Sequence, residues 1–158
     1  MFKNLKFFWV LDKHTTEHHL PDLITRASQQ FKEPINLAII TVATTCSELH
    51  NLNKLNQLPS SILSSVNRLS LIVADNDSDF TERDALEILE FLQTVFNKAN
   101  MLIVTCQLGK SRSPAIAMAI DELILKNKPS KFLKDFANTY NRHIYKVLTN
   151  IWSTKLNT

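Results

Sequence analysis

Short apolar runs alternate along this chain with segments in which apolar residues recur every three or four positions. An apolar run followed by a helical pattern is typical of the buried strands of a parallel sheet. The four runs are Phe7–Leu11, Leu37–Val42, Leu69–Ala74 and Met101–Thr105. This alternation predicts an α/β fold with a short, mostly parallel central sheet flanked by helices.

The segments between and after these runs have helical periodicity. The clearest is Glu82–Asn97, where the apolar residues fall on one face and Thr81 can cap the first turn together with Asp84. The other expected helices are Leu20–Phe31, a weaker Ser60–Val66, Ser113–Leu125, Ser130–Tyr140 and a last one that carries Ile144 and Trp152. The C-terminal third is therefore expected to be helical and to pack on the sheet.

Length and composition limit the class of protein. The 158 residues fit one compact domain, 1–158, and the net charge of +3 suits anionic ligands without requiring nucleic acid. The two cysteines, Cys46 and Cys106, form no disulfide framework, which favours a reducing, cytoplasmic location; Cys46 is expected to be a small buried residue. The run Phe7–Leu11 is too short for a signal-peptide core, and no stretch approaches the length of a membrane span.

The chain contains a single glycine, Gly109. Its turns are therefore made elsewhere by Asn, Asp, Ser and Pro. Gly109 lies in the polar loop between the apolar run Met101–Thr105 and the helix that follows. We expect this position to need a positive φ or a close backbone approach that other residues cannot provide.

The loop around Gly109 also carries reactive side chains. A strand, a short loop and a helix N-terminus point several backbone N–H groups at one place, which binds anions. Cys106 begins this loop, where the positive field favours the thiolate, and Arg112 ends it with a guanidinium that can hold two phosphate oxygens. A nucleophile, several donors and a bidentate cation together suit phosphoryl transfer to sulfur.

The run from Cys106 to Pro114 resembles the signature of the cysteine-based protein tyrosine phosphatase superfamily, and its Ser-Arg-Ser-Pro ending resembles the dual-specificity branch. The resemblance covers Leu69 to about Leu125. It implies that Cys106 attacks phosphorus, that Arg112 clamps the phosphate and that Ser113 hydrogen-bonds the departing thiolate. It further implies a phosphate cradle made by the backbone N–H groups of Gln107, Leu108, Gly109, Lys110, Ser111 and Arg112.

The resemblance also implies an aspartate, in a loop after an upstream strand, that protonates the leaving oxygen. Asp75, Asp77 and Asp79 follow the run Leu69–Ala74. Asp75 follows it directly, and its spacing to Cys106 matches the usual arrangement of the family. We expect Asp75 to be the acid, with Asp77 as the alternative and Asp79 as part of a solvated turn.

Two positions depart from the family pattern. Thr105 stands where the family usually has histidine, which leaves open a pseudophosphatase that binds phosphate without turnover. Lys110 stands at a position that is more often apolar, which leaves open a phosphatase for phosphoinositides or other polyanions. The favoured partner is a phosphorylated protein, most of all one with phosphotyrosine, with phosphate or a similar oxyanion in the loop.

The implied reaction needs no metal and no cofactor. His14, His18 and His19, with Glu17 nearby, lack a further ligand and are expected to be solvated. The lysines of the segment Lys126–Lys134 are not interleaved with aromatic residues in the way that nucleic-acid surfaces are, so no nucleic-acid partner is expected.

Overall fold

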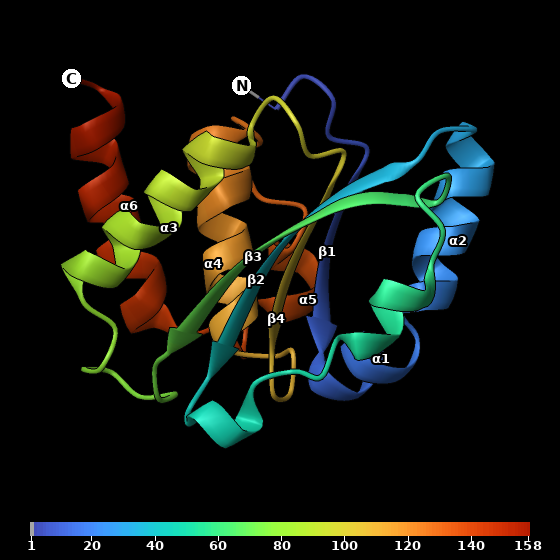
Figure 1. Ribbon diagram of the computed structural model, residues 1–158. Coiled ribbons are helices and arrows are strands. Elements are labelled where there is room, and N and C mark those ends of the chain that lie inside the picture. Colours follow the sequence, from blue (N-terminus) through green and yellow to red (C-terminus); the bar gives the residue numbers. More distant parts are fainter. Residues whose placement is uncertain (1) are drawn as a thin grey trace.

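A four-stranded sheet, in which every neighbouring pair of strands is parallel, forms the centre of the computed structural model, which describes residues 2–158 (Figure 1). In spatial order the strands are β1 (Phe7–Asp12), β4 (Met101–Cys106), β2 (Ile35–Ala43) and β3 (Leu63–Ile72). The predicted α/β class with a parallel sheet is confirmed. Because the strands are parallel, their carboxyl ends meet at one edge, where the connecting loops gather.

Helices cover both faces of the sheet (Figure 1). One face carries α1 (Lys13–His18) and α2 (Leu20–Phe31), and the other carries α3 (Glu82–Val95), α4 (Arg112–Ala119) and α6 (Arg142–Leu156). The remaining short elements are η1 (Cys46–Glu48), η2 (Asn53–Gln57), the π-helical turn η3 (Ile120–Ile124) and α5 (Leu133–Phe136). The predicted capping box of Thr81 and Asp84 begins α3. Within residues 2–158, no helix has the length and apolar character needed to cross a membrane.

Alternate residues of the two central strands feed two separate apolar cores. Ile40 and Val104 face the larger core under α3, α4 and α6, whereas Ile39 and Ile103 face the smaller core under α2. Burial on both faces explains why these strands read as continuous apolar runs. Trp152 of α6 is fully buried in the larger core, and its indole N–H donates to a carbonyl of α3 at 2.8 Å.

The predicted weak helix Ser60–Val66 is wrong, because β3 already begins at Leu63. β3 is an edge strand in which buried or half-buried residues alternate with exposed ones such as Val66 and Arg68. Because one face of β3 is exposed, polar residues interrupt most of the strand. An apolar run is visible only toward its end. Pairing with β2 along the whole strand, from Ile35 opposite Leu63 onward, overrides the local pattern.

Two predicted helices of the C-terminal third are shorter or less regular than expected. Ser113–Leu125 belongs to α4 only in its first half and continues as the π-helical turn η3, while Ser130–Tyr140 contracts to α5. The buried carboxylate of Asp121 accepts hydrogen bonds from the hydroxyl of Ser130 and the backbone N–H of Lys131, both at 2.8 Å. These donors stabilise a loop at the point where a helix was expected to start.

The expectation that Cys46 is buried is also wrong. Cys46 is an exposed free thiol at the start of η1. The chain leaves the sheet at Ala43, so the apolar run that precedes Cys46 does not carry it into the core.

Candidate active site

Cys106 is the last residue of β4, and its side chain is buried next to the start of α4. Its Sγ atom lies 3.1 Å from Oγ of Ser113, which is also buried. The strand ends and the helix begins within this short loop, so the two side chains meet without any long-range contact. The hydroxyl is in position to donate a hydrogen bond to a Cys106 thiolate.

Gly109 meets both conditions expected from the sequence. Its φ is +64°, in the left-handed region, and a Cβ there would lie 2.9 Å from the backbone nitrogen and 3.1 Å from the Cα atom of Asp12. These are backbone atoms at the end of β1, which cannot move aside as a flexible side chain could. The loop therefore packs against β1 at a distance that only glycine allows.

The loop leaves its backbone donors unused. Within residues 2–158, no backbone N–H of residues 107–112 donates a hydrogen bond to another protein group. The carbonyls of Gln107 and Ser111 accept hydrogen bonds from the backbone N–H groups of Lys13 at 3.2 Å and Asn141 at 3.0 Å. These contacts tie both ends of the loop to its neighbours, and the unused N–H groups at the start of α4 form a site suited to an anion.

Arg112 is almost completely buried and held by two elements far from it in sequence. Its Nη1 atom donates to Oγ1 of Thr44 at 3.0 Å and to the carbonyl of Val73 at 2.8 Å. Both bonds use the same nitrogen, so among residues 2–158 the Nε and Nη2 atoms have no hydrogen-bond partner. Those two atoms form an edge of the guanidinium with the geometry to bind two oxygens of an oxyanion at once.

Asp75 lies against the loop that contains Cys106. Its Oδ1 atom accepts hydrogen bonds from the hydroxyl of Ser111 and from Nδ2 of Asn141, both at 2.8 Å. Asn141 is also the N-cap of α6, where its Oδ1 atom accepts from the backbone N–H of Ile144 at 2.9 Å. The start of α6 thus holds the Asp75 carboxylate beside the loop.

The other two aspartates of this segment are placed differently. Asp79 accepts a hydrogen bond from the backbone N–H of Ala74 at 3.3 Å and so closes the turn after β3. Asp77 is exposed, and no side-chain hydrogen bond of Asp77 is present within residues 2–158. Of the three carboxylates, Asp75 is the one that is bonded to the loop.

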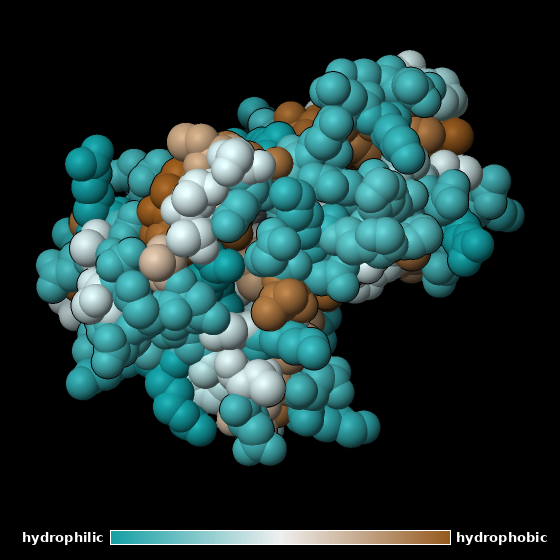
Figure 2. Space-filling model, turned by 90° about the horizontal axis from the view of Figure 1, so that it is seen from below, coloured by the Kyte–Doolittle hydropathy of each residue, from teal (hydrophilic) through white to brown (hydrophobic). Residues whose placement is uncertain are grey.

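The two positions that depart from the family pattern lie in the loop and directly before Cys106. Lys110 is exposed, and Leu108 next to it is 70% exposed. Thr105 is fully buried, with its hydroxyl 3.0 Å from Oγ1 of Thr16 and 3.4 Å from Nδ1 of His50. Figure 2, seen from the side where the strands end, shows a mainly hydrophilic face with small hydrophobic patches.

Three residues of this site were not singled out from the sequence. They are Thr44, Asn141 and His50, which contact Arg112, Asp75 and Thr105. Each lies in a loop far from its partner in sequence, and a lone polar residue in a loop carries no periodic signal. Only the tendency of asparagine to cap helices could have drawn attention to Asn141.

Comparison with solved structures identifies the fold. The human tyrosine phosphatase-like serine/threonine/tyrosine-interacting protein is 16% identical, with a TM-score of 0.63 over 98% of this chain and 96% of that one. Human DUSP28 is 12% identical, with a TM-score of 0.60 over 95% and 94%. The phosphatase domain of Yvh1 from Chaetomium thermophilum is 16% identical, with a TM-score of 0.59 over 98% and 95%.

Sequence comparison alone finds no relative: no protein-family model matches the chain, and no curated protein matches it. The identification therefore depends on three-dimensional similarity, which extends over nearly the whole chain, together with the loop from Cys106 to Pro114. This chain has the fold of the dual-specificity phosphatases.

Proposed function

We propose that this protein hydrolyses phosphate monoesters through a phosphocysteine intermediate, without a metal ion, and that its preferred substrates are phosphotyrosine proteins, with phosphoserine and phosphothreonine as further substrates. The observation that carries the proposal is the hydrogen bond between Asp75 and Ser111. It brings an acid from the loop after β3 to the loop that holds a buried cysteine, a fixed arginine and unused backbone donors.

In the first step, Arg112 and the loop N–H groups bind the phosphate, and the Cys106 thiolate attacks phosphorus. The bond from phosphorus to the ester oxygen breaks as Asp75 gives its proton to that oxygen. Oδ1 of Asp75 accepts two hydrogen bonds, which leaves Oδ2 to carry the proton. The products are the free alcohol or phenol and a phosphocysteine.

In the second step, water attacks the phosphorus and the Asp75 carboxylate takes its proton. The phosphorus–sulfur bond breaks, and inorganic phosphate and the Cys106 thiolate result. The Ser113 hydroxyl, 3.1 Å from Sγ, donates to this thiolate as it leaves. Because catalysis needs Cys106 as a free thiol, we propose the reducing cytoplasm as the compartment.

Two further functions have a specific observation in their favour. Exposed Lys110 in the loop favours a phosphoinositide or another polyanion, and a solved structure of PTPMT1 in complex with PI(5)P is similar to this chain, with 15% identity and a TM-score of 0.53 over 86% of each chain. Thr105 in place of histidine favours a pseudophosphatase that binds phosphate through Arg112 but does not turn it over.

Hydrolysis of a generic aryl phosphate in the presence of a metal chelator tests the proposal. We expect activity that is abolished in Cys106→Ser and falls about a hundredfold or more in Asp75→Asn, the usual loss when a general acid is removed. Asp77→Asn is the matched control, because Asp77 lies in the same loop but is not bonded to Ser111. Equal losses in the two aspartate variants would show that Asp75 is not the acid.

Measurements on the wild-type protein distinguish the proposed function from the two alternatives. If it binds vanadate or phosphate but is inert on aryl phosphate at every pH tested, the pseudophosphatase is correct. A panel of phosphopeptides and phosphoinositides then ranks substrates for an active protein, and a strong preference for the lipid would refute the protein phosphatase.

A further inference from the structure

Thr105, the residue directly before Cys106, is part of a buried polar cluster on the α1 and α2 face of the sheet. Side chains alternate along β4, so Thr105 points away from the face that carries the Cys106 thiol. Its partners Thr16 and His50 are 1% and 4% exposed, and Thr105 itself is 0% exposed. Nothing in the reaction proposed above uses these groups directly.

The protons of this cluster can be assigned one by one. The Thr16 hydroxyl donates its single proton to the carbonyl of Asp12 at 2.7 Å. Its oxygen must therefore accept the proton of Thr105 at 3.0 Å, and the Thr105 oxygen in turn accepts from Nδ1–H of His50 at 3.4 Å. The hydrogen bonds run in one direction, from His50 through Thr105 and Thr16 to Asp12.

This assignment places a proton on Nδ1 of His50. Its Nε2 atom is buried and has no hydrogen-bond partner among residues 2–158. For a buried nitrogen without a partner, the unprotonated state costs less free energy than the protonated state. A proton on Nε2 would place an unpaired positive charge in the interior.

The hydrogen-bond series ends on the backbone that supports the catalytic loop. Asp12 is the partner of Cys106 in the register of β1 and β4. The backbone of Asp12 also makes the close approach to Gly109 that excludes any side chain there. The cluster therefore holds the end of β1 in place. The loop contacts this part of β1 through its first residue, Cys106, and through its turn at Gly109.

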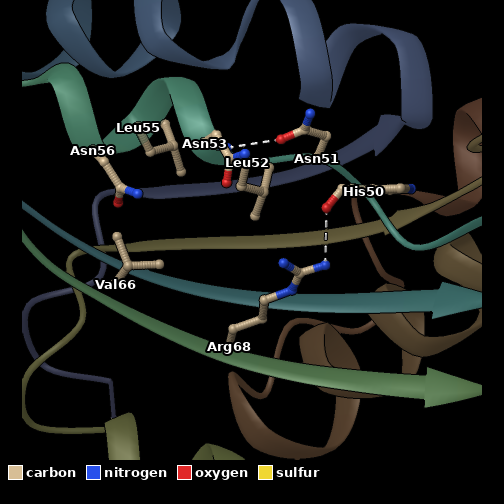
Figure 3. Close-up of a pocket in the computed structure, with 8 residues that line it drawn as sticks. All are labelled: His50, Asn51, Leu52, Asn53, Leu55, Asn56, Val66 and Arg68. Carbon is tan, nitrogen blue, oxygen red and sulfur yellow. Dashed lines mark hydrogen bonds between the residues drawn. The ribbon is translucent and has the colours of Figure 1, made fainter. Parts of the chain in front are cut away.

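His50 is itself held from two sides. Its carbonyl accepts a hydrogen bond from Nη2 of Arg68 on β3 at 3.2 Å, and the next residue, Asn51, donates its backbone N–H to Glu17 of α1 at 2.9 Å. Figure 3 shows the Arg68 bond at the wall of a cavity of about 420 Å³, with the imidazole ring directed away from that cavity. The ring is thereby fixed toward Thr105.

We propose that His50 is a positioning residue for Cys106: by donating to Thr105 it orders the start of the catalytic loop from the segment after β2. The proposal rests on Cys106 being the nucleophile of the proposed function. The histidine that the family places directly before the cysteine is absent, and a histidine from a distant loop supports the residue that replaces it. Without the Nδ1 donor, Thr105 loses one partner and the start of the loop that holds Cys106 loosens.

The rate of Cys106 alkylation by iodoacetamide as a function of pH tests this inference. The background is Cys46→Ser, because the exposed Cys46 thiol would also react. We expect His50→Phe and Thr105→Val each to raise the midpoint of the pH–rate profile by about 0.5–1 pH unit, a shift that corresponds to the free energy of about one hydrogen bond. His50→Asn, which keeps an N–H near the position of Nδ1, should stay within about 0.3 pH unit of wild type.

Thr41→Val is the matched control. Thr41 lies opposite Thr105 on the neighbouring strand β2 and is equally buried, but its hydroxyl has no hydrogen-bond partner among residues 2–158. The same substitution there should leave the midpoint unchanged. Combining His50→Phe with Thr105→Val should give less than the sum of the single shifts, since both remove the same hydrogen bond.

Alkylation needs no substrate, so the two proposals fail separately. A protein that hydrolyses aryl phosphate but shows the same midpoint in wild type, His50→Phe and Thr105→Val refutes the role of His50 alone. Equal shifts in Thr105→Val and Thr41→Val also refute it, because they would reflect general loosening of the sheet. A wild-type protein that is inert on phosphate esters but shows the expected shifts refutes the proposed function alone.

Discussion

The buried imidazole of His50 should make the protein less stable as the pH falls from 7 to 5. The pKa of His50 is lowered from 6.5 to about 4, and burial is the largest cause. Lys13 and Arg68 also lower this pKa, whereas Glu17 and Asp12 raise it. The folded protein therefore resists a proton that the unfolded chain accepts readily.

The sign and size of the effect follow from proton linkage. Above the unfolded pKa of 6.5, both states are neutral at His50 and the full stability is present. As the pH falls below that value, the unfolded chain binds a proton and the folded state does not, so the free energy of unfolding drops by up to about 1.4 kcal/mol per pH unit. Integrated from pH 7 to pH 5, the loss is about 2 kcal/mol, and it stops growing near the folded pKa of about 4.

Urea unfolding of wild type and His50→Phe at the two pH values measures this loss. The variant lacks the titrating group, so its stability should fall by about 2 kcal/mol less than that of wild type over the same interval. The other histidines and the carboxylates are common to both proteins and cancel in the difference. If both proteins lose the same stability, His50 accepts a proton in the folded state and the buried, neutral ring described above is refuted.

Three more substitutions test other parts of the structure. Gly109→Ala forces a side chain into the left-handed region and against the backbone of Asp12, so we expect a loss of about 1–3 kcal/mol in thermal or urea unfolding and weaker vanadate binding; full vanadate affinity would contradict the described loop. Trp152→Phe leaves a carbonyl of α3 without its buried donor, which should cost about 1–3 kcal/mol in urea unfolding and leave vanadate binding unchanged. Ser113→Ala removes the hydroxyl that we propose donates to the departing Cys106 thiolate, so stopped-flow hydrolysis of an aryl phosphate should show a burst followed by slow turnover; a slower burst with no change in its amplitude would place Ser113 in the first step instead.

The class of fold and the strand–loop–helix unit around Gly109 could be predicted from the sequence, because both depend on residues that are neighbours in the chain. The central strands β2 and β4 are buried on both faces, so they appear as uninterrupted apolar runs. Cys106, Gly109 and Ser113 share one strand–loop–helix unit, in which spacing along the chain nearly determines spacing in space. The left-handed Gly109 followed from its being the single glycine of the chain.

The boundaries of irregular segments could not be predicted, because tertiary contacts decide them. The start of β3 depends on its pairing with β2, and the helix expected after Pro129 is displaced by hydrogen bonds to the Asp121 carboxylate. The local sequence pattern shows neither which strand a segment will pair with nor where a buried carboxylate will lie. The choice of Asp75 as the acid stays a prediction, although its contact with Ser111 gives a physical reason to prefer it.

The sequence by itself determined which groups could perform chemistry at Cys106, since a thiol, a glycine turn and a cation occupy one short loop. Only the tertiary structure decided how these groups are held. Thr44 and Val73 fix Arg112, and His50 reaches Thr105, through hydrogen bonds between segments far apart in the chain. Such bonds depend on how parallel strands place their loops at one edge of the sheet, which residue spacing does not encode.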